Sequence, residues 1–133
     1  GTLAYTWGES PRVGSLGCGT SGVILGERVP LSRVPPLHGT AEVVWQRASF
    51  ELSAGLRWAT MQDRLAISDY ADARIPKYGT PGFAVVDLRS SFRIHDRVQL
   101  GGVLENIGNV AYRYHGSSVD GPGRGFMLSM KVD

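Results

Sequence analysis

Apolar and polar residues alternate along six segments of the chain, the pattern of a β-strand with one apolar face. The clearest segment is residues 50–60, where every second residue is apolar: Phe50, Leu52, Ala54, Leu56 and Trp58. The other five segments are residues 3–7, 37–45, 84–94, 98–105 and 126–133. The sequence therefore predicts an all-β fold, an antiparallel meander of about six strands.

The charged residues of these segments all fall on the polar face. They are Glu42, Glu51, Arg57, Asp87, Arg89, Arg93, Glu105, Lys131 and Asp133. A face free of charge is expected where strands contact lipid, because a lipid-facing Arg or Lys costs about 2 to 4 kcal/mol at the bilayer midplane. The pattern favours a sheet that spans a membrane, although a soluble β-sandwich also alternates.

Short and long connections alternate between the predicted strands. Residues 46–49 and 95–97 make tight turns, whereas residues 9–36, 61–81 and 110–121 make long links rich in Gly, Pro and Ser. Outer-membrane barrels have short turns on one side and long loops on the other. Aromatic residues lie near the strand ends, which predicts two interfacial girdles: Trp45, Phe50 and Phe92 at the short turns, and Trp7, Trp58, Phe83 and Tyr112 toward the long loops.

Composition narrows the class of protein. The 18 glycines among 133 residues suit strands and turns better than helices. The net charge of +2 comes from 14 basic and 12 acidic residues spread along the chain, so nucleic acid is not an expected partner. No apolar run approaches the roughly 20 residues of a spanning helix, and residues 1–8 do not resemble a signal peptide. An outer-membrane interpretation therefore places the natural N-terminus upstream.

Motifs for catalysis or cofactor binding are weak. Residues 17–22 (GCGTSG) match the spacing G-x-G-x-x-G, but the flanking residues do not predict the strand and helix that this fingerprint needs. Cys18 is the single cysteine, and His38, His95 and His115 have no metal-ligand spacing. No nucleophile with its base is recognisable. We therefore expect no enzyme activity, no metal site and no cofactor.

Four stretches, in order along residues 31–133, resemble the C-terminal barrel of TonB-dependent outer-membrane receptors. They are LSRVPPLH at 31–38, GTPGF at 79–83 followed by VDLR at 86–89, VLENIGNVAYR at 103–113, and GPGRGF at 121–126. The resemblance implies a 22-stranded barrel in the bacterial outer membrane, filled by a plug domain, that imports a scarce nutrient. The whole chain would be a C-terminal segment of the barrel, without the plug.

The resemblance also implies partners and roles. The partners are the remaining strands and the plug, a TonB-type energy-coupling protein, outer-membrane lipid, and a nutrient such as a siderophore, cobalamin or haem. Outer-loop residues that would contact the nutrient are Tyr112, Arg113, Tyr114 and His115. The residues that would face the lumen and plug are Glu42, Glu51, Arg57, Asp87, Arg89, Arg93 and Glu105.

Two other functions fit the same pattern. An oligomeric outer-membrane pore or structural barrel would use copies of the chain to close the sheet, because six strands are fewer than the eight of the smallest barrels. A soluble β-sandwich binding module would instead enclose the apolar faces in a core of its own. Conductance across a bilayer would distinguish the first, and a folded monomer in water would distinguish the second.

Overall fold

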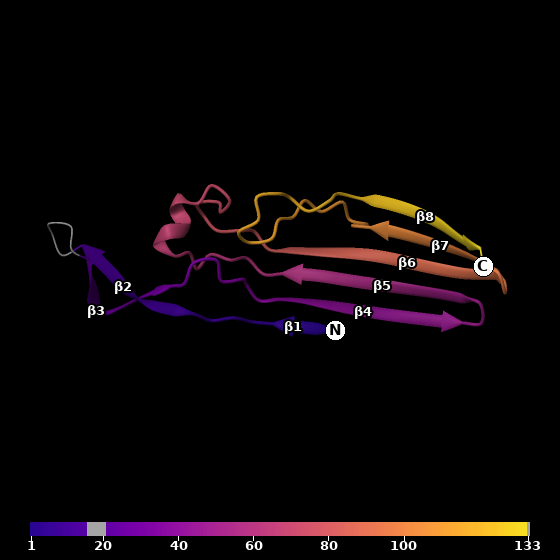
Figure 1. Cartoon of the computed structure of the whole chain (residues 1–133), viewed down its shortest axis with the longest axis horizontal. Coiled ribbons are helices and arrows are strands. Elements are labelled where there is room, and N and C mark those ends of the chain that lie inside the picture. The colour runs from indigo at the N-terminus through magenta and orange to yellow at the C-terminus, as the bar shows by residue number, and fades with distance from the viewer. Residues whose placement is uncertain (16–20, 133) are drawn as a thin grey trace.

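The chain forms one large antiparallel sheet whose strands all run between the same two ends (Figure 1). The structure is a computed structural model and describes residues 1–15 and 21–132. The sheet contains β1 (Thr2–Ala4), β4 (His38–Arg47), β5 (Phe50–Ala59), β6 (Phe83–His95), β7 (Val98–Glu105) and β8 (Gly125–Val132), side by side in that order. The predicted all-β meander of six strands is confirmed.

The connections differ at the two ends of the sheet. Two-residue turns at Ala48–Ser49 and Asp96–Arg97 join β4 to β5 and β6 to β7 at one end. The long connections, with the short 3-10 helix η1 (Ile67–Ala71), lie at the other end (Figure 1). We call these the turn end and the loop end. Among the described residues, no helix is long and apolar enough to cross a membrane.

The first predicted long link contains two strands that the sequence did not predict. Residues 9–36 contain a separate hairpin of β2 (Glu9–Ser15) and β3 (Ser21–Pro30), which projects beyond the loop end in Figure 1. β1 is also shorter than predicted, because Tyr5 and Trp7 leave the sheet and the Trp7 ring stacks under the Arg64 guanidinium at 3.3 Å. Cys18, the first four residues of the glycine-rich motif at 17–22, and Asp133 lie outside the described residues.

Cross-strand register places the alternating residues on two faces. Phe50 pairs with Phe92, Ala54 with Leu88, and Leu88 in turn with Leu104. These residues share the apolar face, while Arg57, Asp87 and the other predicted polar-face residues share the opposite one, which we call the charged face.

The apolar face has no second layer over it in the described part of the chain. Val43 is 72% exposed and Leu128 is 78% exposed, although both are large apolar residues in the sheet. Leu56, Leu88 and Leu104 lie on this face and are only partly covered. Each strand of the large sheet makes its main contacts with its neighbours in that sheet. Over residues 1–15 and 21–132, the sheet is therefore not one half of a closed sandwich.

The most enclosed residues lie largely in the connections of the loop end. Leu65, Ala66 and Ile75 are buried there, and Asp69 is 1% exposed. The Asp69 carboxylate accepts hydrogen bonds from the Ser32 hydroxyl and, at 2.9 Å, from the Ala66 backbone N–H. These contacts join connections that are far apart in the sequence. The loop end thus has a small core of its own.

Candidate functional site

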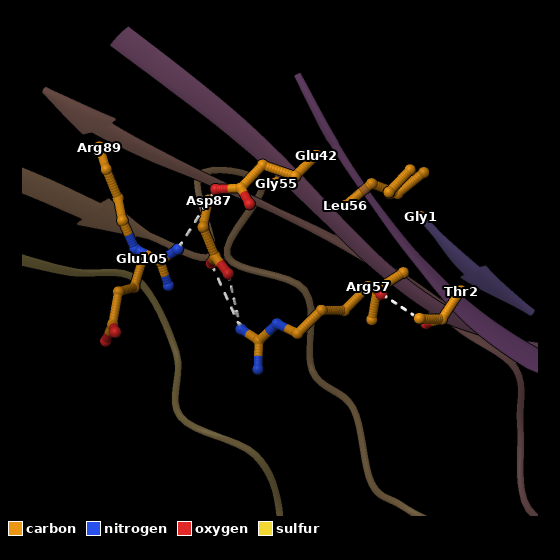
Figure 2. Close-up of a pocket in the computed structure, with 11 residues that line it drawn as sticks. Gly1, Thr2, Glu42, Gly55, Leu56, Arg57, Asp87, Arg89 and Glu105 are labelled. Carbon is orange, nitrogen blue, oxygen red and sulfur yellow. Dashed lines mark hydrogen bonds and ion pairs between the residues drawn. The ribbon is translucent and has the colours of Figure 1, made fainter. Parts of the chain in front are cut away.

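Charged side chains gather over a shallow hollow on the charged face, near the middle of the sheet. The hollow has a volume of about 340 Å³, and its charged lining residues come from β4, β5, β6 and β7: Glu42, Arg57, Asp87, Arg89 and Glu105. Figure 2 shows the Arg57 guanidinium reaching across to Asp87, and Arg89 reaching to Glu42. Five of the seven residues predicted to face the lumen therefore meet here.

The other two predicted residues lie elsewhere on the same face. Glu51 and Arg93 line a smaller hollow of about 150 Å³ beside the turn end, together with Gln46 and Gln99. Alternation alone placed all seven residues on one face, but the strand register separates them into two groups. Contact between this face and a plug stays a prediction.

Asp87 is the most enclosed charge of the central hollow. It is 6% exposed and pairs with Arg57 at 3.0 Å between Nη2 and Oδ2. Its Oδ1 accepts a hydrogen bond of 2.9 Å from the backbone N–H of Asn106. A carboxylate removed from water needs such partners, because an unpaired buried charge is costly. Asp87 therefore links the middle of β6 to the connection that follows β7.

Asn106 holds that connection in a fixed conformation. Its φ is +46°, in the left-handed region that asparagine tolerates better than most residues. Its side-chain amide donates to the carbonyls of Val110 and Pro122, and its Oδ1 accepts from the Val110 N–H, all at 2.9 Å. The residue is 1% exposed. These bonds hold the two ends of the connection, residues 106 and 122, together.

Aromatic residues of this connection pack on the charged face at the loop end. The centre of the Tyr112 ring lies 4.8 Å from that of Phe83 and 5.8 Å from that of Tyr114. The Arg57 guanidinium carbon lies 5.9 Å from the centre of the Tyr112 ring. Tyr112 is 5% exposed. The predicted place of Phe83 and Tyr112 in an apolar-face girdle is therefore wrong: Phe83 alternates onto the charged face, and Tyr112 packs against it. Trp45, Phe50 and Phe92 do lie on the apolar face near the turn end.

A second pocket opens beside this aromatic cluster. It has a volume of about 170 Å³ and a mainly apolar lining, with three prolines, Phe83 and Tyr114. Three of the four residues predicted to contact a nutrient line it, Arg113, Tyr114 and His115, whereas buried Tyr112 supports it from beside. Arg113 is held by Asp120 at 2.6 Å, a pair that lowers the pKa of the Asp120 carboxyl and raises that of Arg113.

Two histidines from distant parts of the sequence line this same pocket. His38 begins β4, and its Nδ1 lies 2.8 Å from the Pro36 carbonyl oxygen. His115 comes from the connection after β7, and its Nδ1 lies 2.9 Å from the Thr80 hydroxyl. Burial lowers the pKa of His115, although Asp69 and Asp72 oppose this shift. The spacing of His38 and His115 in the sequence did not indicate that they lie near one pocket, because the folding of two long connections brings them together.

A metal ion would need more ligands than these two histidines. Among the residues that the structure describes, no group of three or more His, Cys, Asp or Glu side chains is placed to hold a metal ion. Thr80, Pro81 and Phe83 complete the pocket wall. The sequence did not predict these three as site residues, although all three belong to the GTPGF stretch that leads into β6.

Comparison with known proteins supports the fold. Searches against protein-family models and curated proteins gave no match. Among solved structures, the chain is similar to the copper transporter OprC, with a TM-score of 0.68, 20% sequence identity and 98% of this chain covered. The two share a fold over this region. The chain spans 20% of the length of that transporter.

Proposed function

We propose that the chain forms part of the wall of an outer-membrane transport barrel, with its apolar face against lipid and its charged face toward the lumen. The observation that carries this proposal is the uncovered apolar face, on which Val43, Leu128 and their neighbours are exposed. An exposed apolar patch of this extent is typical of a surface that meets a membrane or another protein. The similarity to a transporter supports a transport role in general.

Further strands must complete the wall. In the large sheet, β1 and β8 each pair on one side only. An unpaired strand edge in lipid would leave backbone N–H and C=O groups without partners, at a cost of several kcal/mol each. The remaining strands would come from additional sequence, from another chain or from copies of this one. The resemblance to TonB-dependent receptors favours a single large barrel.

In that role the barrel would import a scarce nutrient, with a plug on the charged face and energy from a TonB-type protein. The central hollow supports this part of the proposal, because its ion pairs are partly exposed and could exchange for contacts with a plug. The cargo would be a siderophore, cobalamin, haem or a metal such as copper, the last suggested by the name of the similar structure.

Cysteine labelling tests which face meets lipid. In a background in which Cys18 is replaced by Ser, Leu128→Cys on the apolar face and Ser129→Cys on the charged face form a matched pair of adjacent positions. In lipid vesicles, we expect a membrane-soluble maleimide to label Cys at position 128 and a charged, water-soluble maleimide to leave it unlabelled. If the water-soluble maleimide labelled position 128 as fully as the membrane-soluble one, the result would contradict the proposal.

The same preparation separates the alternatives. Ion conductance that needs no plug would indicate an oligomeric pore. A stable folded monomer in water, with position 128 protected from both reagents, would indicate a soluble module with a covered core.

A further inference from the structure

The His115 ring joins two long connections at the loop end. It belongs to the connection after β7, and its Nδ1 lies 2.9 Å from the hydroxyl of Thr80, which belongs to the connection before β6. Thr80 is itself held in place, because it is 4% exposed and its backbone N–H and C=O both bond to Gln62, at 2.9 and 3.0 Å. The hydrogen bond therefore ties the connection after β7 to a fixed partner.

The other nitrogen of the same ring, Nε2, is enclosed and has no hydrogen-bond partner. Thr80 can donate to Nδ1 or accept from it, so the neutral His115 ring fits in either tautomer. The protonated ring carries an N–H at both nitrogens, and the N–H at Nε2 then has no acceptor. An enclosed donor without an acceptor costs more free energy when its group is charged. The closed arrangement therefore disfavours the protonated ring.

The carboxylates nearest to His115 do not supply the missing acceptor. Asp69 and Asp72 favour the protonated ring through their negative charge, but burial has the larger effect and lowers the pKa of His115. The Asp69 carboxylate is already engaged in two hydrogen bonds of its own. The Asp72 carboxylate lies 3.2 Å from Arg33 and 2.6 Å from Arg74, whose positive charges offset its own.

Two further groups that carry or can take up a positive charge, Arg113 and His38, line the same pocket as His115. Arg113 is positive, and so is His38 once it is protonated, so both oppose a positive charge on His115. Arg113 also pairs with Asp120 at 2.6 Å, which closes residues 113–120 into one loop. A movement of this loop away from Thr80 would widen the pocket, because the other lining residues belong to other segments.

We propose that residues 113–120 form an acid-sensitive latch, which is closed while the neutral His115 ring bonds to Thr80 and opens when the ring takes up a proton. In the open state the ring reaches water, and its pKa returns to the ordinary value of about 6.5. The closed state binds the proton less readily. Acid therefore raises the ratio of open to closed latch, by up to about tenfold for each pH unit below 6.5. The latch does not depend on which face of the sheet meets lipid, so it can fail without the proposed function failing.

Distances between two spin labels test the latch in the full chain. Val119 and Tyr78 are 70% and 88% exposed and lie in the two connections that the latch joins, so each can be replaced by a labelled Cys in a background with Cys18→Ser. We expect one distance at pH 8 and an additional, longer distance at pH 5. A second labelled pair at the turn end, Gln46→Cys and Gln99→Cys, is the control and should not change. An unchanged distance between the first two labels would overturn the proposal.

Variants of His115 identify the group that takes up the proton. His115→Gln cannot titrate in this range, and its amide can still bond to Thr80, so we expect one distance at both pH values. His38→Gln should keep the response to pH. A pH response that persists in His115→Gln would overturn the proposal.

NMR of protein labelled with ¹⁵N-histidine measures the same step without a change at position 115. The His115 ring should titrate over the pH range in which the distance between the labels changes. Titration of the ring without the change in distance, or the change in distance without the titration, would overturn the proposal. This comparison also decides the matter if His115→Gln is open at both pH values.

Discussion

Replacing Asp87 tests whether the central hollow depends on a fixed carboxylate. Asp87→Ala removes the ion pair with Arg57 and leaves the backbone N–H of Asn106 without its acceptor. Water cannot readily replace that acceptor, because Asn106 is only 1% exposed. The ion pair contributes about 1 kcal/mol or less, because the Arg57 side chain is 36% exposed. The orphaned N–H adds about 1 to 3 kcal/mol. We therefore expect a loss of about 1 to 4 kcal/mol in the free energy of unfolding.

Asp87→Asn separates the two contributions. The amide oxygen still accepts from Asn106, so only the charge is lost and the expected cost falls to about 1 kcal/mol. Urea unfolding of the vesicle-bound protein, followed by tryptophan fluorescence, measures both variants through the shift of the midpoint at unchanged slope. Glu51→Ala, on the same face but exposed, is the control and should change stability by less than about 0.5 kcal/mol. Equal losses for the Ala and Asn variants at position 87 would refute this account of Asn106.

Three further changes have defined outcomes. Gly121→Ala would place a Cβ 2.1 Å from a ring carbon of Tyr112, so we expect that ring to be displaced and its near-ultraviolet circular dichroism to be lost. Leu128→Arg should disfavour insertion into vesicles by about 2 to 4 kcal/mol, measured as folded yield, whereas Ser129→Arg on the charged face should insert normally. Stability should fall as pH drops below the ordinary His pKa of about 6.5, since burial lowers the folded-state pKa of His115 and the unfolded chain then binds more protons; unfolding at several pH values measures it.

Each of these predictions has a control in the chain. Gly55→Ala adds a Cβ with no atom within 4 Å, so the Tyr112 signal should remain unchanged. If Ser129→Arg blocked insertion as strongly as Leu128→Arg, the assignment of the two faces would be wrong. His115→Gln cannot titrate in this range, so its stability should lack the part of the pH dependence that His115 supplies. An identical pH profile for this variant would show that burial of His115 has no energetic effect.

The strands of the sheet could be predicted from the sequence, because one face of each strand is apolar and the other is polar. Residues 50–60 alternate without interruption, and the structure places β5 at Phe50–Ala59. The charges of β6 are equally regular, so their common face could be predicted as well. Alternation has a period of two and depends only on neighbouring residues.

The loop end could not be predicted in the same way. Residues 9–15 read ESPRVGS, in which Pro11, Gly14 and the serines suggest a loop, yet these residues form β2. The pocket between His38 and His115 depends on the way two long connections fold over one end of the sheet, which no local pattern encodes. Tyr112 shows the same limit, because its burial results from contacts with Phe83 and Tyr114 rather than from its position near a strand end.

The core at the loop end has a consequence for the intact protein. Leu65, Ala66, Asp69 and Ile75 are buried in the connections of the loop end, whereas large apolar side chains of the sheet such as Val43 and Leu128 are exposed. Extraction by detergent replaces the surroundings of the strands but not the contacts within this core. In a barrel oriented with this end outward, an antibody raised against the extracted protein should therefore still recognise living cells.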